Sequence, residues 1–268
     1  MTEAGNGEQF KFRDVVLQGK FARLEPLQPA HAEGLFAAGA TPEIWRFFTL
    51  PPIAKLADAE GFIASALANA RGGKEWPYAI IDLASGKVAG STRYLDLRAE
   101  HFGVEIGSTW LGLPYQRTAI NTECKLMLLG HAFEVLGMQR VQLKTGTLNV
   151  KSQRAIERLG AVREGVLRSH MLLPPSPLRD KYHEELGLIR PASKDEIDRA
   201  FRELALQLHP DKAKSPEELQ ANNERLAALE QAYKALKAPA LRDTVMYSIL
   251  RSEWPAVRDG LRAKLENR

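Results

Sequence analysis

Residues 115–123 combine polar side chains with the start of an amphipathic helix, a pattern suited to binding a phosphate group. A strand is expected over 103–110, and the helix that follows carries Cys124 and Leu128 on one face. The first turn of a helix has unpaired backbone N–H groups and partial positive charge, which favour an anion such as a pyrophosphate. Arg117 adds a cation beside that turn. An ordinary strand–helix connection has the same spacing, so a purely structural interpretation stays open.

A second candidate is the tripeptide His209-Pro210-Asp211, which lies between two helical patterns. Apolar residues recur at helical spacing over 197–208, and this pattern stops because proline disfavours helix in the residue before it. A second apolar face runs over 226–236. Two amphipathic helices joined by a short loop predict an antiparallel hairpin. By itself, the tripeptide is too common to indicate a function.

The elements that must position residues 115–123 form a mixed α+β pattern. Strands are expected over 15–25, 78–83, 88–94, 103–110, 140–145, 162–171 and 244–252, with helices between several of them. This order predicts a mixed sheet flanked by helices. The strand pattern stops near Asp180 and resumes near Thr244, so the helical hairpin is expected to be inserted between the last two strands, as exposed loops allow. We therefore expect a discontinuous domain, 10–180 plus 244–268, and an inserted domain, 181–243.

The composition is typical of a globular protein without a strong charge bias. The chain has 268 residues, of which 44% are hydrophobic, and it carries 37 Lys and Arg against 33 Asp and Glu. Residues 181–243 hold 11 basic and 12 acidic residues, which leaves 26 basic and 21 acidic for the rest. The excess of basic over acidic residues outside 181–243 would suit an anionic ligand, although a solvated surface explains it equally well. A net charge of +4 gives no argument for nucleic acid binding.

Several features predict a cytoplasmic protein without a metal or a membrane span. The apolar stretches fall far short of the ~20 residues that a membrane helix needs, and residues 1–9 lack the pattern of a signal peptide. The single cysteine, Cys124, cannot form an intrachain disulfide, which fits a reducing compartment. Histidines do not follow a ligand spacing; they include His31, His101, His131 and His170.

Five stretches of the outer domain carry a family resemblance: 42–46 (Pro-Glu-Ile-Trp-Arg), 104–107 (Val-Glu-Ile-Gly), 116–123, 149–156 and 159–161. They resemble the GNAT family of acetyl-CoA-dependent N-acetyltransferases, in particular its RimJ/RimL-like branch, over roughly 15–180 plus 244–265. The resemblance implies a GNAT-type mixed sheet and acetyl-CoA as cosubstrate. It also implies an amine acceptor, either a protein N-terminus or a small amine.

The resemblance places the CoA pyrophosphate in the loop before the helix. In the family, a loop with the pattern Gln/Arg-x-x-Gly-x-Gly/Ala cradles this group. The corresponding residues here are Gln116, Arg117, Thr118, Ala119, Ile120 and Asn121. Both expected glycines are replaced, by Ala119 and Asn121. The alanine is a small change and Asn121 can cap the helix, so the anion geometry is expected to survive.

The resemblance also implies roles for three polar residues. Acetyl transfer needs a group that accepts the ammonium proton of the amine, and Glu105 lies on the strand that resembles the family's base-bearing strand. Asn149 is placed to bind the pantetheine arm, and Ser152 to act near the thiolate leaving group. The structural alternatives are an ion pair with an arginine for Glu105 and helix capping for the other two.

Other reactive or aromatic residues are interpreted as core. Cys124 is expected to be buried, because direct transfer in this family needs no acyl-enzyme. Trp45, Phe47, Phe48 and Trp110 could line an acceptor pocket, although such residues more often belong to a core.

The inserted segment resembles the J domain of DnaJ-type co-chaperones over about 181–241, on the stretches 182–188, 192–197, 201–212 and 229–236. In that family the His-Pro-Asp tripeptide, here His209, Pro210 and Asp211, stimulates ATP hydrolysis by a DnaK-type chaperone. Glu203 and Gln207 stand where lysines are usual, so docking is expected to be weaker or selective. A spacer retained for its fold is the alternative.

Two hypotheses about function follow. In the first, the chain is an N-acetyltransferase whose J domain recruits a DnaK-type chaperone. In the second, it is a co-chaperone adaptor in which the acetyltransferase fold is a binding or structural module.

Overall fold

The structure is a computed structural model that describes residues 15–172, 182, 184–188, 192, 194–237 and 241–267. The expected domain boundaries at residue 10 and at 180–181 lie outside these described residues. The chain divides into two compact units. The first unit comprises residues 15–48, 52–168 and 243–267. The second unit comprises residues 49–51 and the described residues between 169 and 242.

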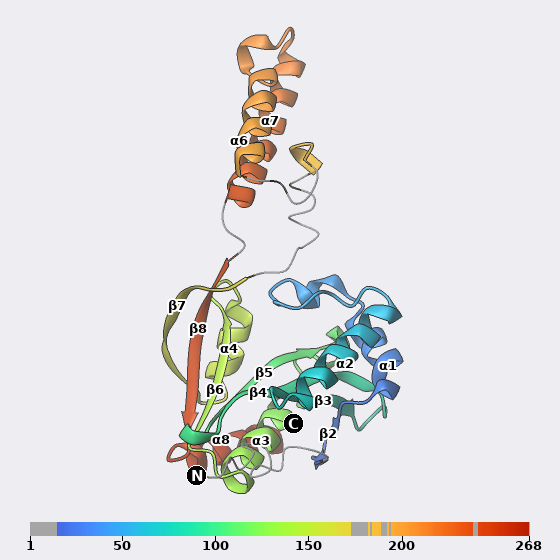
Figure 1. Cartoon of the computed structure of the whole chain (residues 1–268), viewed down its shortest axis with the longest axis vertical. Helices are drawn as coiled ribbons and strands as arrows, with labels where there is room; N and C mark the ends of the chain where they lie inside the picture. Colours follow the sequence, from blue (N-terminus) through green and yellow to red (C-terminus); the bar gives the residue numbers. More distant parts are fainter. Residues whose placement is uncertain are drawn as a thin grey trace. The chain divides into compact units, whose positions relative to one another are not determined.

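An eight-stranded mixed sheet is the frame of the first unit (Figure 1). Its strands are β1 (Leu17–Gln18), β2 (Ala22–Pro26), β3 (Glu75–Asp82), β4 (Val88–Arg98), β5 (Gly103–Leu111), β6 (Arg140–Gly146), β7 (Val162–Leu172) and β8 (Leu241–Leu250). They lie in the order β1-β2-β3-β4-β5-β6-β8-β7. Neighbouring pairs from β1 to β5 are antiparallel, β5 and β6 are parallel, and β6 and β8 are antiparallel. The expected α+β class is therefore confirmed.

The expected single strand over 15–25 is wrong, because a turn divides it into β1 and β2. The side chain of Glu123, on the following helix α3, accepts hydrogen bonds from the backbone N–H groups of Lys20, Phe21 and Ala22, each at 2.7 Å. A Cβ atom at Gly19 would lie 2.3 Å from the carboxyl carbon of Glu123. The glycine therefore leaves room for the carboxylate that holds the turn.

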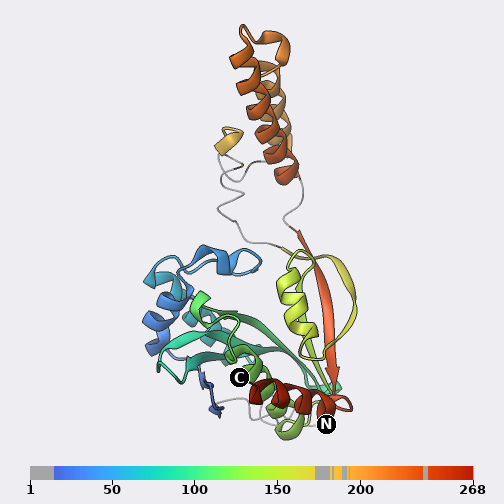
Figure 2. The same ribbon diagram turned by 180° about the vertical axis from the view of Figure 1, so that it is seen from behind.

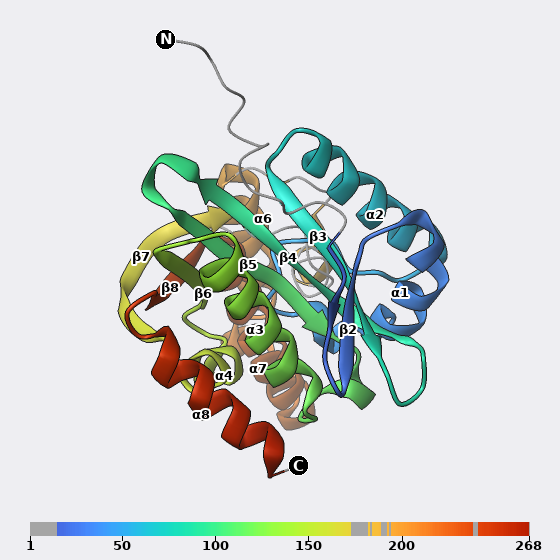
Figure 3. The same cartoon turned by 90° about the horizontal axis from the view of Figure 1, so that it is seen from below.

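Helices cover both faces of this sheet (Figure 3). α1 (Ala32–Gly39) and α2 (Leu56–Arg71) lie side by side on one face, and α3 (Ile120–Gly130) and α8 (Trp254–Glu266) on the other. The first unit has one hydrophobic core on each face of the sheet, and side chains along β3 alternate between them. Tyr78 and Ile80 pack into the core on the α3 side, and Ala79 and Ile81 pack into the core on the α1–α2 side. β3 is consequently buried on both faces, as a central strand requires.

The helix expected up to residue 136 changes its winding near its end. α3 is followed by a π-helical segment, His131–Val135, and Gly137 then adopts a φ of +70°. Glu134 in this segment accepts a hydrogen bond of 2.6 Å from the indole N–H of Trp254. Phe133 packs on the same ring, with centroids 5.6 Å apart. The π segment thus fastens the end of α3 to α8.

The helix α4 (Val150–Glu157) follows β6 and packs beside it (Figure 2). Ile156 is buried in the same core as the inner face of α3. Ser152 lies on α4 and Asn149 is its N-cap, so the packing of this helix fixes the position of both polar residues relative to the sheet.

The second unit contains a helical hairpin, as expected. α6 (Lys194–Gln207) and α7 (Pro216–Lys237) pack on one another, and in chain order they follow β7 and precede β8. Ile197, Leu229 and Leu236 form part of the seam. The rings of Phe201 and Tyr233 stack with centroids 4.1 Å apart. The hairpin therefore has a small hydrophobic core of its own.

Among the described helices, none is both long and apolar enough to cross a membrane.

Candidate active site

The divergence of two parallel strands creates the central feature of the site. β5 and β6 pair over three positions, Gly103↔Arg140, Val104↔Val141 and Glu105↔Gln142. Beyond these, β5 continues to Leu111 and β6 to Gly146 without a shared register. Each strand therefore presents one backbone edge along this stretch. Such edges can pair with an extended chain that carries amide groups.

A bulge in β5 lies on the diverging stretch. Ser108 has a φ of +46°, and the pairing with β4 shifts between Ser91 and Arg93. A bulge re-aims the side chains around it, and such irregularities are common next to active sites. Here it keeps Glu105 and Gly107 on one face of the sheet, while Thr109 faces α3, whose Lys125 it contacts.

Glu105 is a buried carboxylate with a cationic partner on the neighbouring strand. Its side chain is 2% exposed, and Oε2 lies 2.9 Å from Nζ of Lys144. Gln142 Nε2 also donates to Oε2 at 3.1 Å. A Cβ atom at Gly107 would lie 2.7 Å from Oε1. The expected alternative, an ion pair with an arginine, is corrected: the partner is a lysine of β6.

Gln142 connects Glu105 to further charged groups. Its Nε2 donates to Asp96 Oδ2 at 2.8 Å, and its Oε1 accepts from Arg98 Nη2 at 2.6 Å. Asp96 itself has a φ of +51°. This network orients the amide of Gln142, which in turn fixes the carboxylate of Glu105.

The loop before α3 is held by the side chain of Gln116. Its Nε2 donates to the backbone carbonyl of Leu111 at 2.8 Å, and its Oε1 accepts from Lys151 Nζ at 2.7 Å. The first bond ties the loop to the end of β5, and the second ties it to the first turn of α4. Gln116 therefore brings β5, the loop and α4 together.

The helix begins two residues earlier than an Asn121 cap would require. α3 starts at Ile120 with Ala119 at the N-cap position, so the expectation that Asn121 caps the helix is wrong. The hydroxyl of Thr118 donates to the Tyr115 carbonyl at 2.8 Å and accepts from the Ile120 N–H at 3.3 Å. Arg117 is exposed and adopts a φ of +63°. Asn121 is half-buried in the first turn.

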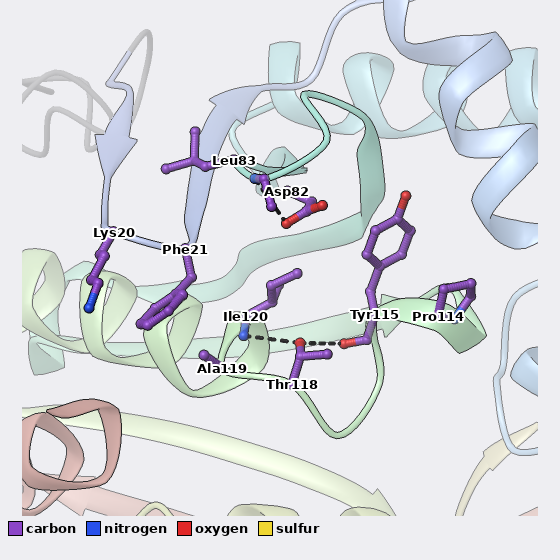
Figure 4. Close-up of a pocket in the computed structure, with 10 residues that line it drawn as sticks. Lys20, Phe21, Asp82, Leu83, Pro114, Tyr115, Thr118, Ala119 and Ile120 are labelled. Carbon is purple, nitrogen blue, oxygen red and sulfur yellow. Dashed lines mark hydrogen bonds between the residues drawn. The ribbon is translucent and has the colours of Figure 1, made fainter. Parts of the chain in front are cut away.

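A cavity of about 390 Å³ borders this loop (Figure 4). Thr118, Ala119 and Ile120 form one wall together with Tyr115. The opposite wall comes from the β1–β2 turn and the β3–β4 turn and includes Phe21. Of the residues expected to bind pyrophosphate, Thr118, Ala119 and Ile120 therefore line this cavity, while Gln116 contacts α4 through Lys151.

Asn149 and Ser152 lie at the start of α4. Asn149 Oδ1 accepts a hydrogen bond of 3.1 Å from the Ser152 N–H, so the expected capping role of Asn149 is confirmed. Ser152 is half-buried. Because Lys151 binds Gln116, this helix end lies next to the loop that starts α3.

The interpretation as core residues is confirmed for Trp45, Trp110 and Cys124, whereas Phe47 is half-buried and belongs to neither core of the first unit. Trp45 and Trp110 are 6% and 3% exposed and pack with ring centroids 5.1 Å apart, and Phe48 packs against them from the rim. Cys124 is fully buried, and desolvation raises the pKa of its thiol to about 12. Such a thiol is a poor nucleophile.

In the second unit, the His-Pro-Asp tripeptide lies in the connection between α6 and α7. His209 Nδ1 accepts from the Asp211 N–H at 3.3 Å, and Pro210 begins a short 3-10 turn. The side chains of His209 and Asp211 are 55% and 87% exposed. The tripeptide is thus a surface feature that does not support the hairpin core.

Within the described part of the chain, no group of three or more His, Cys, Asp or Glu residues is arranged to hold a metal ion.

A family model described as an acetyltransferase (GNAT) domain matches residues 22–162, more than half of the chain. The chain belongs to the GNAT acetyltransferase family. A GCN5-related N-acetyltransferase from Brucella melitensis is 25% identical to this GNAT chain, with a TM-score of 0.66 over 94% of this chain and 86% of that one. A T. thermophilus protein assigned as an acetyltransferase is 29% identical, with a TM-score of 0.64 over 93% and 96%. This membership supports an acyltransferase.

A RimJ protein is among the solved structures that share the GNAT fold of this chain. Mycobacterium smegmatis RimJ in complex with CoA-disulfide has a TM-score of 0.60 over 94% of this chain and 96% of that one. At 14% identity, this likeness concerns the fold alone.

A second family model, described as a DnaJ domain, matches residues 181–245 of the GNAT chain. DnaJ homolog subfamily C member 3 of Rattus norvegicus is 40% identical over 81 residues, which are 30% of this chain and 16% of that protein. The chaperone protein DnaJ of Chlorobium phaeobacteroides is 46% identical over 59 residues, 22% of this chain and 14% of that protein. The chain therefore spans only a small part of these relatives.

Sequence reasoning missed three lysines and a glutamine around this site. Gln142 and Lys144 alternate with Val141 and Leu143 on β6, so their shared face was predictable, but their pairing with Glu105 was not. Lys151 and Lys125 carried no signal beyond their charge, since an isolated lysine on a helix is usually solvated.

Proposed function

We propose that this protein transfers an acetyl group from acetyl-CoA to an amine by direct attack of the amine on the thioester. The observation that carries the proposal is the divergence of β5 and β6 beyond the Glu105↔Gln142 pair. The pantetheine arm of CoA is an extended chain with amide groups, and the two open strand edges offer it backbone partners. Membership in the GNAT family supports the same assignment.

The pyrophosphate of CoA would bind at the start of α3. The backbone N–H groups of Ala119 and Asn121 and the partial positive charge of the helix favour an anion there, while the Ile120 N–H donates to the Thr118 hydroxyl. Arg117 and Thr118 are exposed at the same loop, and Gln116 holds the loop in place through Leu111. Asn149 would keep the start of α4 in position beside the pantetheine arm.

In the reaction, the nitrogen lone pair of the acceptor forms a bond to the carbonyl carbon of the thioester. The carbon–sulfur bond then breaks, and its electron pair leaves on sulfur as a thiolate. The proton lost by the amine goes to Glu105, directly or through a water, and it finally reaches the thiolate or solvent. Ser152 would stand near the departing sulfur.

Glu105 is suited to orient and deprotonate an amine because its position is fixed from two sides. Lys144 and Gln142 both contact Oε2, which leaves Oε1 on the side of Gly107. An acceptor ammonium that approaches Oε1 would meet a carboxylate already held in one orientation. A protein N-terminus and a small amine both satisfy this requirement.

The acetyltransferase would occupy 10–180 plus 244–268, with the J domain inserted at 181–243. The GNAT family model ends at 162, so the assignment of β7, β8 and α8 to the same domain rests on their place in the sheet and in the core. We assign acetyl-CoA and an amine as the partners of the outer domain.

A DnaK-type chaperone is the partner we assign to the inserted domain. The observation that favours it is the exposure of the His209 and Asp211 side chains in the connection between α6 and α7. The adaptor role, with an inert acetyltransferase fold, is the second candidate function.

The two functions are separated by an assay of thiol release from acetyl-CoA with a panel of amines, including N-terminal peptides and polyamines. The enzyme hypothesis predicts release that depends on both the amine and the protein. Absence of release with every amine, together with stimulation of a DnaK-type ATPase, would favour the adaptor.

A further inference from the structure

Lys125 is a buried lysine that the proposed reaction does not use. It lies on α3, is 5% exposed, and its Nζ donates to Thr109 Oγ1 at 2.6 Å. Desolvation lowers the pKa of its ammonium to about 8. Within the described residues, Lys125 forms no ion pair with a carboxylate. Burial of an ammonium without a counter-charge costs free energy of folding, so a buried lysine at this position requires an explanation.

The nearby carboxylate on the same helix does not serve as that counter-charge. Glu123 is 5% exposed, and its two oxygens accept three backbone N–H groups from Lys20 to Ala22. Cys124 is the other titratable neighbour that acts on Lys125, and its thiol carries no charge below a pKa of about 12. The partner of Lys125 from the sheet, Thr109, is a neutral hydroxyl, and the Thr109 hydroxyl in turn contacts the neutral hydroxyl of Thr92.

The position of Lys125 relates it to the diverging strands. Thr109 follows the bulge at Ser108 on the part of β5 that β6 no longer pairs. The Thr109 hydroxyl lies 2.7 Å from Thr92 Oγ1 and 3.4 Å from the Gly107 carbonyl oxygen. The ammonium of Lys125 therefore lies on the α3 face of the sheet, next to the unpaired edge of β5. Glu105 lies on the opposite face, together with Gly107.

We infer that Lys125 supplies positive charge to the thioester end of the bound acyl carrier and lowers the energy of the departing thiolate. This inference rests on the proposed acetyltransferase function. The carbon–sulfur bond breaks with its electron pair on sulfur, and a nearby cation in a water-poor environment stabilises that charge more than it would in water. At pH values below about 8, Lys125 keeps its proton throughout the reaction, and Thr109 holds its position.

A purely structural role predicts that replacement of Lys125 leaves the reaction rate unchanged. If Lys125 only filled space between α3 and the sheet, methionine would fill it equally well without a buried charge. Replacement of a lysine kept for electrostatics is therefore expected to leave the fold intact or more stable while chemistry is lost.

The test measures the fraction of the CoA thiol that is ionised at pH 7.5, where Lys125 is still protonated, when CoA is bound to the full chain, from the ultraviolet absorbance of the thiolate. Desulfo-CoA supplies the baseline, and Cys124, the one cysteine of the chain, stays silent because burial raises its pKa to about 12. We compare wild type with Lys125→Met and Lys125→Arg. Lys87→Met, an exposed site in the β3–β4 turn, is the matched control.

The expected result on the wild type is an ionised fraction about tenfold or more above that of free CoA at the same pH, because an opposite charge nearby lowers the pKa of a thiol by about one unit or more. Lys125→Met returns the value toward that of free CoA, Lys125→Arg retains part of the shift, and Lys87→Met behaves as wild type. The kcat of Lys125→Met falls by about 100-fold, whereas its Kd for CoA changes little.

An unshifted thiol on the wild type overturns the inference without any variant, and so does an equal shift on wild type and Lys125→Met. Calorimetry distinguishes this failure from that of the proposed function. If CoA does not bind the wild type at all, the acetyltransferase assignment is overturned, and the role of Lys125 with it.

Discussion

Lys144 Nζ on β6 lies 2.9 Å from Glu105 Oε2 on β5, so one ion pair bridges the two strands where they begin to diverge. The pair holds the candidate base on the strand edge that the acyl carrier would use. It also makes the two residues dependent on each other, because removal of one leaves a buried charge without its partner.

Glu105→Gln is expected to lower kcat/KM by about 100-fold or more, since a general base contributes about that much to the rate. Binding of acetyl-CoA should be unchanged, because the amide still fits between Gln142 and Lys144. The deficit should shrink as pH rises toward the pKa of the acceptor amine, which then arrives already neutral. Steady-state rates across pH and calorimetry measure both effects. A deficit that is constant across pH would assign Glu105 a structural role.

Lys151→Met removes the bond to Gln116 Oε1 that joins the loop to α4. A hydrogen bond to a charged group contributes about 1.5–3 kcal/mol, so the Kd for acetyl-CoA is expected to rise about tenfold while kcat stays within about threefold. Arg154→Met, an exposed cation one turn along the same helix, is the control. Equal effects of the two variants would indicate general charge attraction instead of a held loop.

The stability of the protein should depend on pH through Lys125. Because burial lowers its folded pKa from 10.5 to about 8, the folded state loses the proton first as pH rises. Between pH 8 and 10.5 the unfolded state therefore binds more protons than the folded state. The folded state no longer carries a buried charge there, so the free energy of unfolding rises with pH across this window. Relative to Lys125→Met, the wild type should gain up to about 3 kcal/mol in free energy of unfolding. Denaturant titrations of both proteins at pH 7.5 and above pH 10 measure it. A constant difference would show that this ammonium is not desolvated.

His209→Gln is expected to abolish stimulation of a DnaK-type ATPase and to leave the fold intact. The His209 side chain is 55% exposed and makes local contacts: Nδ1 accepts from the Asp211 N–H and lies 3.5 Å from Asp211 Oδ2. Surface changes of this kind usually alter the free energy of unfolding by less than about 0.5 kcal/mol. ATP turnover with the full chain measures the effect, and Glu224→Gln on α7 serves as control. Stimulation that survives in His209→Gln, or that is missing in the wild type, rejects a chaperone contact through this tripeptide.

Much of the fold follows from local patterns in the sequence. The β3–β4 hairpin was predicted because alternation and a Ser85-Gly86 turn lie close together in the chain, and the α6–α7 seam was predicted from its 3.6-residue spacing. The division of 15–25 into two strands was missed because its cause is distant: Glu123 holds the turn from another element, about a hundred residues away.

The site was less accessible to sequence reasoning for a similar reason. Glu105 was found only through a family resemblance, and its partner Lys144 comes from a strand that the chain reaches after α3. Asn121 was expected to cap α3, but the helix begins at Ile120 and the hydroxyl of Thr118 binds its N–H. Lys125 interrupts an apolar pattern by a single residue, and periodicity cannot reveal that its ammonium reaches Thr109.

Hydrogen exchange of the full chain with and without saturating acetyl-CoA tests the central claim most directly. Bound carrier should protect backbone amides along both diverging edges and at the start of the helix between them, that is, in 106–111, 116–122 and 143–152. Protection confined to these segments is the predicted result. Unchanged exchange there, or protection only in other parts of the chain, would contradict the account.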